Sequence, residues 1–246
     1  MKKKHLPLIL LIIFLPFSSP AQDKISVAVE AGFISAFREI AADFEEKTGV
    51  KVEATFSPAA NLFGQIKNGA PYDIFLSDDE RQPDLLQKEG ITEGAFIYAR
   101  GRTILWSVNK DFCKAANWQD ALKNGKIKKV AVADPLTAPY GISAKAALEK
   151  AGLWGVLKGK LVNGEDVSRS FQYASTQAVD AGFCALSAAS SPQGRVGCFY
   201  EIKEAPAVVQ AGCILKNARN KICAELFTAY MMSGQTAPVK MKYGYR

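Results

Sequence analysis

Strand-like and helix-like segments alternate over the first ninety or so residues, and this alternation constrains the fold more than any other feature. Ile25–Val29 is rich in β-branched residues, and the apolar positions of 33–47 recur at the spacing of an amphipathic helix. The segments that continue the series are strands at 50–56 and 72–77 and helices at 62–67 and 79–88. Such a series predicts right-handed βαβ units around a parallel sheet.

The pattern changes at Phe96–Arg100 and Arg102–Asn109, two extended runs that follow each other closely. Runs of this kind carry a chain from one lobe into another. A second α/β unit follows, with strands at 129–133 and 182–187 and helices at 118–123, 141–150 and 167–179. An extended run at 208–216 then leads back toward the first lobe, and 222–232 forms a closing helix. The sequence therefore predicts an α/β protein of two lobes.

The first 21 residues have the features of a secretory signal. Lys2–Lys4 precede the apolar run LPLILLIIFLPF, and Ser19-Pro20-Ala21 resembles the small-residue pattern of a cleavage site. We expect cleavage near Ala21 and export to a bacterial periplasm. The alternative is an uncleaved N-terminal anchor. No cysteine stands at the cleavage site, so we expect no lipid anchor there.

Several function classes are disfavoured by what the mature chain lacks. The only histidine, His5, lies in the signal segment, which removes Ser-His-Asp and His-ligated zinc chemistry. The sequence has no phosphate-binding glycine motif and no basic run interleaved with aromatics. We therefore expect no enzyme activity, no cofactor, no metal centre and no nucleic-acid partner.

The five cysteines leave two interpretations open. No two are close enough for a C-x-x-C pair, and an oxidising compartment favours one or two disulfides. The same residues also suit buried positions as small hydrophobes. The pairing cannot be read from the positions, which are Cys113, Cys184, Cys198, Cys213 and Cys223.

Candidate binding residues lie at four predicted helix starts, of which the first three follow the end of a predicted strand and the fourth is a helix start alone. Free N–H groups and the helix dipole attract anions at such positions, and ligands of open α/β sheets collect at the carboxyl ends of the strands. The turns concerned are Glu30-Ala31-Gly32, Ser57–Asn61, Thr137–Gly141 and Gly164–Val167. Two lobes that face each other with such turns would form a clamp around a ligand.

Four stretches resemble a known family, the periplasmic molybdate-binding proteins of ABC importers. QIKNGAPYDIFLS at 65–77 matches the family pattern Q-I-x-x-G-A-P-x-D-[LIV]-F-[LIV]-S. The other matches are Asp134-Pro135 with Pro139-Tyr140-Gly141, Glu165–Val167, and the ending Tyr243–Tyr245. The resemblance implies a two-lobed clamshell of the type II periplasmic-binding-protein architecture, with a mixed sheet in each lobe. It implies lobes at 23–98 plus 205–246 and at 99–204. It also implies molybdate or tungstate as the solute, a membrane permease as partner, and a monomeric protein.

Transferred position by position, the resemblance implies a binding site with unusual residues. The family's ligand contacts fall on Gly32, Ala59, Tyr140, Val167 and Ala185. Three of these replace side-chain hydroxyl donors of the family, namely Gly32, Ala59 and Ala185. Backbone donors remain at Gly32, Ala59 and Val167. Replacement donors are available nearby at Ser57, Asn61, Tyr140, Ser168 and Ser187.

Glu30 stands two positions before Gly32, where a small neutral residue is usual in the family. If its carboxylate faces the cleft, it repels a dianion and favours a cation or an amine. If it points outward, it is a surface charge. Three hypotheses follow: an oxyanion receptor with substituted donors, a receptor of the same fold for an organic solute or a cation, and a module that binds another protein.

Overall fold

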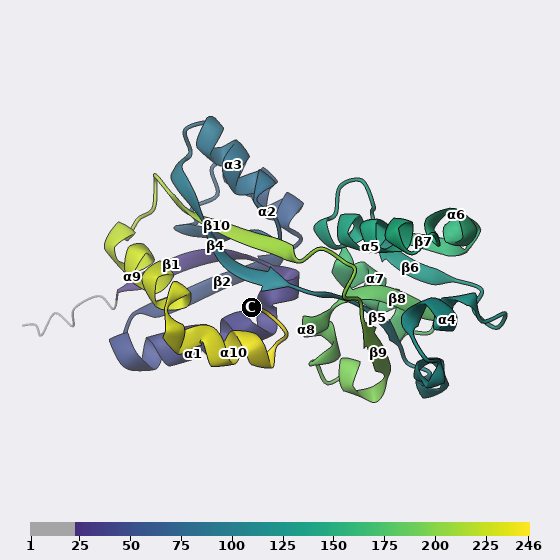
Figure 1. Ribbon diagram of the computed structural model, residues 1–246. Helices are drawn as coiled ribbons and strands as arrows, with labels where there is room; N and C mark the ends of the chain where they lie inside the picture. The colour runs from purple at the N-terminus through teal and green to yellow at the C-terminus, as the bar shows by residue number, and fades with distance from the viewer. Residues whose placement is uncertain (1–22) are drawn as a thin grey trace, which may run out of the picture.

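The computed structural model describes residues 23–246, which form two α/β lobes side by side (Figure 1). The predicted signal segment, 1–21, lies outside the described residues. Within them, no helix combines the length and the apolar character needed to cross a bilayer. Each lobe is built on one five-stranded mixed sheet, as predicted.

The sheet of the first lobe has the order β2-β1-β3-β10-β4. Its strands are β1 (Lys24–Glu30), β2 (Lys51–Ser57), β3 (Ile74–Leu76), β4 (Thr92–Gly101) and β10 (Val208–Leu215). β1 runs parallel to both neighbours, so Glu30 lies beside Ser57 and Val29 beside Leu76. The carboxyl ends of β1, β2 and β3 therefore share one edge of the sheet.

Helices cover this sheet on both faces (Figure 1). They are α1 (Ile34–Thr48) after the 3-10 turn η1 (Ala31–Phe33), α2 (Ala59–Lys67), α3 (Arg81–Lys88), α9 (Lys221–Met232) and, after η5 (Gly234–Thr236), α10 (Ala237–Lys242). Gly49 ends α1 as the sequence predicts, because its φ of 73° lies in the left-handed region that favours glycine.

The second lobe repeats this architecture with the sheet order β7-β6-β8-β5-β9. Its strands are β5 (Thr103–Ser107), β6 (Val130–Ala133), β7 (Leu161–Gly164), β8 (Ala181–Ala185) and β9 (Cys198–Glu201). Its helices and turns are η2 (Lys110–Lys114), α4 (Trp118–Lys123), α5 (Pro139–Lys150), α6 (Trp154–Leu157), η3 (Lys158–Lys160), α7 (Val167–Ser175), α8 (Leu186–Ala189) and η4 (Gly194–Val196).

Two segments join the lobes. The chain leaves the first sheet after Gly101, which pairs with Val208, and enters the second sheet at Thr103. It returns between β9 and β10. We expected the crossing at residues 98 and 99, but β4 continues in the first sheet to Gly101, so the chain crosses slightly later, at Arg102.

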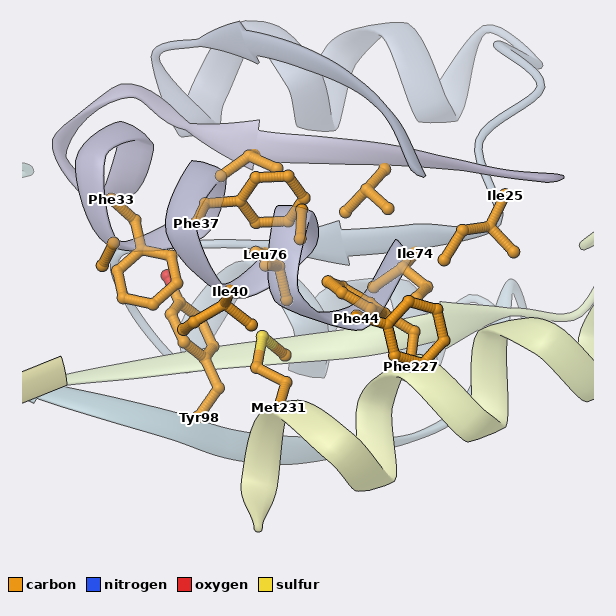
Figure 2. Packing of buried hydrophobic residues seen from close by; sticks show 14 of the residues in the cluster. Ile25, Phe33, Phe37, Ile40, Phe44, Ile74, Leu76, Tyr98, Phe227 and Met231 are labelled. Atoms are coloured by element: carbon orange, nitrogen blue, oxygen red, sulfur yellow. The ribbon is translucent and has the colours of Figure 1, made fainter. Parts of the chain in front are cut away.

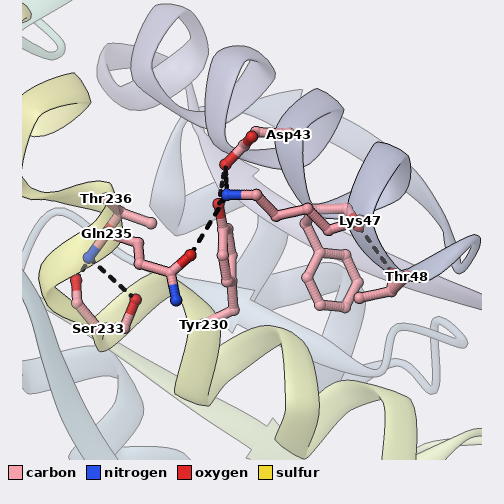
Figure 3. Close-up of polar contacts among 8 residues, drawn as sticks. Asp43, Lys47, Thr48, Tyr230, Ser233, Gln235 and Thr236 are labelled. Atoms are coloured by element: carbon pink, nitrogen blue, oxygen red, sulfur yellow. Dashed lines mark hydrogen bonds and ion pairs between the residues drawn. The ribbon is translucent and has the colours of Figure 1, made fainter.

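The core of the first lobe is aromatic and brings together distant parts of the sequence (Figure 2). Phe37 and Phe44 recur on one face of α1 and are buried. Phe44 packs edge-on against Phe227 of α9, with ring centroids 5.0 Å apart. Figure 3 shows that polar contacts continue this interface at the surface, where Lys47 of α1 bonds Asp43 and the hydroxyl of Tyr230. Helix α9, from the C-terminal part of the chain, thus completes the first lobe.

One disulfide lies in the second lobe and joins Cys113 of η2 to Cys198 of β9. The remaining cysteines are free and buried: Cys184, Cys213 and Cys223. The disulfide interpretation is therefore correct for Cys113 and Cys198, and the buried-hydrophobe interpretation is correct for the other three cysteines.

Candidate functional site in the cleft between the lobes

A cavity of about 260 Å³ lies between the two lobes and contains part of the predicted site. The first lobe contributes the start of α1 with its preceding turn, and the second lobe contributes α7, the end of β8 and the residues after it. Among the predicted contacts, the cavity is lined by Gly32, Val167, Ala185, Ser168 and Ser187. Residues about 150 positions apart therefore meet at the helix starts that the sequence indicated.

Tyr140 lies next to this cavity but points toward the joint between the lobes. It is 3% exposed and belongs to a buried cluster with Val167, Ala185 and Val208. Its hydroxyl accepts a bond of 3.3 Å from Nε2 of Gln210 in β10. A Cβ on Gly101 would collide with the same hydroxyl. Glycine at the crossing point is thus what lets Tyr140 reach across to the first lobe.

The remaining predicted residues lie elsewhere in the first lobe. Ala59 is the first residue of α2 and is buried against the core beneath that helix. Ser57 and Asn61 line a separate open hollow along α2. Ala59, Ser57 and Asn61 do not line the 260 Å³ cavity; of the predicted contacts, only the five named above are among its lining residues.

Glu30 is buried, with only 4% of its surface exposed. Its Oε2 accepts a bond of 2.8 Å from the backbone N–H of Gly32, which caps η1. A Cβ on residue 32 would stand 2.8 Å from Oε1, so the carboxyl group occupies the side-chain space that glycine leaves open. Glu30 is therefore not a surface charge: it is buried behind Gly32 and is not among the residues that line the cavity, and the backbone donor predicted at Gly32 is already bonded to its carboxylate.

Two further carboxyl groups act on the charge of Glu30 and were not among the predicted site residues. Asp78 follows β3 on the same sheet edge, and Asp166 caps α7 in the other lobe by accepting from the N–H of Arg169. Burial, together with the Asp78 and Asp166 charges, raises the pKa of Glu30 to about 8. Burial and the neighbouring acids likewise raise the pKa of Asp78 to about 7. Asp78 was within reach of sequence reasoning, because it follows a predicted strand end.

The C-terminal residues also support the site. Tyr245 is 2% exposed, and its hydroxyl donates to the carbonyl of Gly32 over 2.7 Å. The backbone of Arg246 exchanges two hydrogen bonds with Arg100 of β4. The ending Tyr243–Tyr245 resembles the ending of the family. Its position gives it a structural role, because the hydroxyl of Tyr245 holds the turn at Gly32 in place.

Comparison with known proteins agrees with this geometry. The family model described as bacterial extracellular solute-binding protein matches residues 25–246. The molybdate-binding protein ModA of Azotobacter vinelandii is 33% identical over 90% of this chain and 89% of its own length. ModA of Rhodobacter capsulatus is 30% identical over 92% and 89%. The solved periplasmic molybdate-binding protein of Azotobacter vinelandii superposes with a TM-score of 0.80 at 26% identity, covering 90% of this chain and 98% of that one. The chain therefore belongs to the molybdate-binding protein family of bacterial extracellular solute-binding proteins.

Proposed function

We propose that this chain is the periplasmic receptor of an ABC importer and captures a small tetrahedral oxyanion, of the molybdate or tungstate kind, between its lobes. After cleavage near Ala21 the monomeric protein would deliver the oxyanion to a membrane permease. Its role is binding and release, with no catalytic step. Membership of the molybdate-binding family supports this role, and the cavity between the lobes supports the size class of the ligand.

The observation that carries the proposal is the helix start at the cavity wall. Val167 and Ser168 are the first residues of α7, and the first N–H groups of a helix have no partner within it. Asp166 bonds the N–H of Arg169, which leaves those of Val167 and Ser168 to meet a ligand. The helix dipole adds positive potential there. No Lys or Arg is among the described residues that line the cavity, so an anion would be held by neutral donors.

A second candidate function follows from the acidic groups. Glu30 is bonded to Gly32 of the cavity wall, Asp166 precedes Val167, and Asp78 acts on the charge of Glu30. None of the three acids lines the cavity itself, but their combined charge favours a solute with a positively charged amine. A metal ion is a poorer match, because no group of three or more His, Cys, Asp or Glu side chains within 23–246 is arranged to hold one. This candidate requires Glu30 to be ionised when the solute binds.

Thermal unfolding of the mature protein with a panel of solutes separates the two candidates. We expect molybdate or tungstate to raise the melting temperature, since a ligand at about 100 times its Kd adds about 2.7 kcal/mol. Sulfate, phosphate, small organic amines and divalent cations complete the panel. Stabilisation by amines with no response to any oxyanion at millimolar concentration would replace the first candidate by the second.

A matched pair of variants tests the helix start itself. Val167→Pro removes one backbone N–H at a position where proline is tolerated, because it is the first residue of the helix. Val167→Ala keeps the N–H and shortens the side chain. We expect Val167→Pro to weaken oxyanion binding about 10- to 100-fold, the equivalent of one hydrogen bond to a charged group, and Val167→Ala to weaken it less. Equal affinities in calorimetric titration would remove α7 from the site.

A further inference from the structure

One oxygen of Glu30 has no partner although it is buried. Oε2 is bonded to the N–H of Gly32, whereas Oε1 has no hydrogen-bond partner among the described residues. A buried carboxylate oxygen without a partner is costly, because water is lost and nothing replaces it. Protonation at Oε1 removes the charge, and it turns the orphan acceptor into a donor that needs an acceptor of its own.

The three tyrosine hydroxyls near Glu30 are bonded to groups other than Glu30. The hydroxyl of Tyr98 donates to the carbonyl of Ser77, and that of Tyr245 donates to the carbonyl of Gly32. The oxygen of Tyr140 accepts from Gln210. The charged groups that face Glu30 are Asp78 from the end of β3 and Asp166 from α7, both acidic; Arg81 acts on Asp78 and partly offsets it.

The location of Oε1 connects it with the ligand. It lies 2.8 Å from the point where a Cβ of residue 32 would stand, so it is next to Gly32, which lines the cavity, although Glu30 itself is not among the lining residues. We propose that Glu30 is the specificity-determining donor of this cleft: its carboxylic acid form donates a hydrogen bond from Oε1 to an oxygen of the bound dianion, so that oxyanion and proton are held together. This inference rests on the proposed oxyanion function. The proton comes from water when the free protein is ionised, and it leaves with the ligand.

The surroundings of Glu30 agree with this role. Burial and the two neighbouring acids raise its pKa to about 8, so the acid form dominates at neutral pH. A bound dianion raises that pKa further, because it adds negative charge nearby. Linkage then requires that affinity for the dianion fall as pH rises above the pKa of the free protein, by up to tenfold per pH unit.

The test is calorimetric titration of the mature protein with molybdate and tungstate between about pH 6.5 and about pH 9.5. Both stay dianions over this range, unlike phosphate. We expect nearly constant affinity up to about pH 7.5, a loss of about fivefold between about pH 8 and about pH 9, and a slope that approaches tenfold per pH unit above that. Buffers of different ionisation enthalpy should show about one proton taken up per oxyanion at the alkaline end.

Variants assign the effect to Glu30. Glu30→Gln keeps a neutral donor of the same length, and we expect its affinity to be independent of pH and higher than that of the natural protein at about pH 9. Asp78→Asn removes a charge that raises the pKa of Glu30 and should move the loss to lower pH. Glu46→Gln, at an exposed position near the far end of α1, is the control and should leave the profile unchanged.

The outcomes are distinguishable. Absence of oxyanion binding at every pH, in both the natural protein and Glu30→Gln, refutes the proposed function. Binding that is tight and independent of pH in the natural protein overturns the role of Glu30 and leaves the function intact. Affinity that rises with pH also overturns the role of Glu30. The same conclusion follows if the affinity of Glu30→Gln depends on pH in the same way as that of the natural protein.

Discussion

Asp73 lies in the stretch most typical of the family, yet it acts on the fold and not in the cleft. It is 3% exposed; its Oδ2 accepts from the N–H of Ser26 over 2.7 Å, and its Oδ1 accepts from the N–H of Arg219 over 2.6 Å. It thereby ties β1 to the loop before α9. We expect Asp73→Ala to lower the free energy of unfolding by about 2–4 kcal/mol in urea titrations, because buried N–H groups lose their acceptor.

Exposed Glu46→Ala is the control for that substitution and should change stability by less than about 0.5 kcal/mol. Oxyanion affinity should stay the same in Asp73→Ala at temperatures where the variant is folded. A stability change no larger than that of the control would show that the hydrogen bonds of Asp73 are replaced by water.

The direction of Glu30 illustrates what the sequence cannot decide at the scale of residues. Predicted helix starts pointed to Gly32 and Val167 as candidate binding residues, and both line the cavity. Glu30 remained open, because a central strand covered on both faces has no alternation that tells inside from outside. Its neighbours Asp78 and Asp166 come from two other elements, one in each lobe. Their meeting depends on tertiary packing, which no local pattern contains.

At the scale of elements, most segments were predictable, including the six-residue helix α4 predicted at 118–123, and the errors were confined to short segments and segment ends. The helix predicted at 33–47 is α1, and the strand predicted at 208–216 is β10. β7 went unpredicted, since four residues at a sheet edge are too few to show a period. The strand predicted at 182–187 ends at Ala185, where the short helix α8 begins.

The disulfide is an element-scale constraint that sequence left open. It joins η2 to β9 across a separation of 85 residues, beside Tyr200, whose hydroxyl donates to the carbonyls of Phe112 and Ala115. We expect the double variant Cys113→Ser/Cys198→Ser to lose about 2–5 kcal/mol of unfolding free energy, because the unfolded chain regains the entropy of a long loop. Urea titration of both proteins measures this loss.

Thiol titration of the natural protein in denaturant checks the pairing independently. We expect it to detect only the thiols of Cys184, Cys213 and Cys223. Treatment of the natural protein with a reductant should lower its stability to that of the double variant. Five reactive thiols in the exported protein would contradict the pairing.

For the molecule as a whole, the buried acids of the cleft predict an unusual dependence of stability on pH. The pKa of Glu30 is raised from 4.5 to about 8 in the folded protein. Between these values the unfolded chain releases the proton and the folded protein keeps it, so the free energy of unfolding falls as pH rises. The slope from one such group reaches about 1.4 kcal/mol per pH unit. Asp78, raised from 3.8 to about 7, acts in the same direction.

The interval from about pH 6 to about pH 8 isolates this effect. Acids whose pKa is lowered, such as Glu39 and Glu45, finish titrating below it. Burial lowers the pKa of Lys240 to about 8. Lys240 therefore makes the fold more stable with rising pH only above this interval. Histidine contributes nothing after cleavage, because His5 is the only one.

We expect urea midpoints of the ligand-free protein to fall across this interval and those of Glu30→Gln to fall less. Parallel curves for the two proteins would mean that Glu30 is ionised in the folded state, and would favour the amine-binding function over the oxyanion receptor.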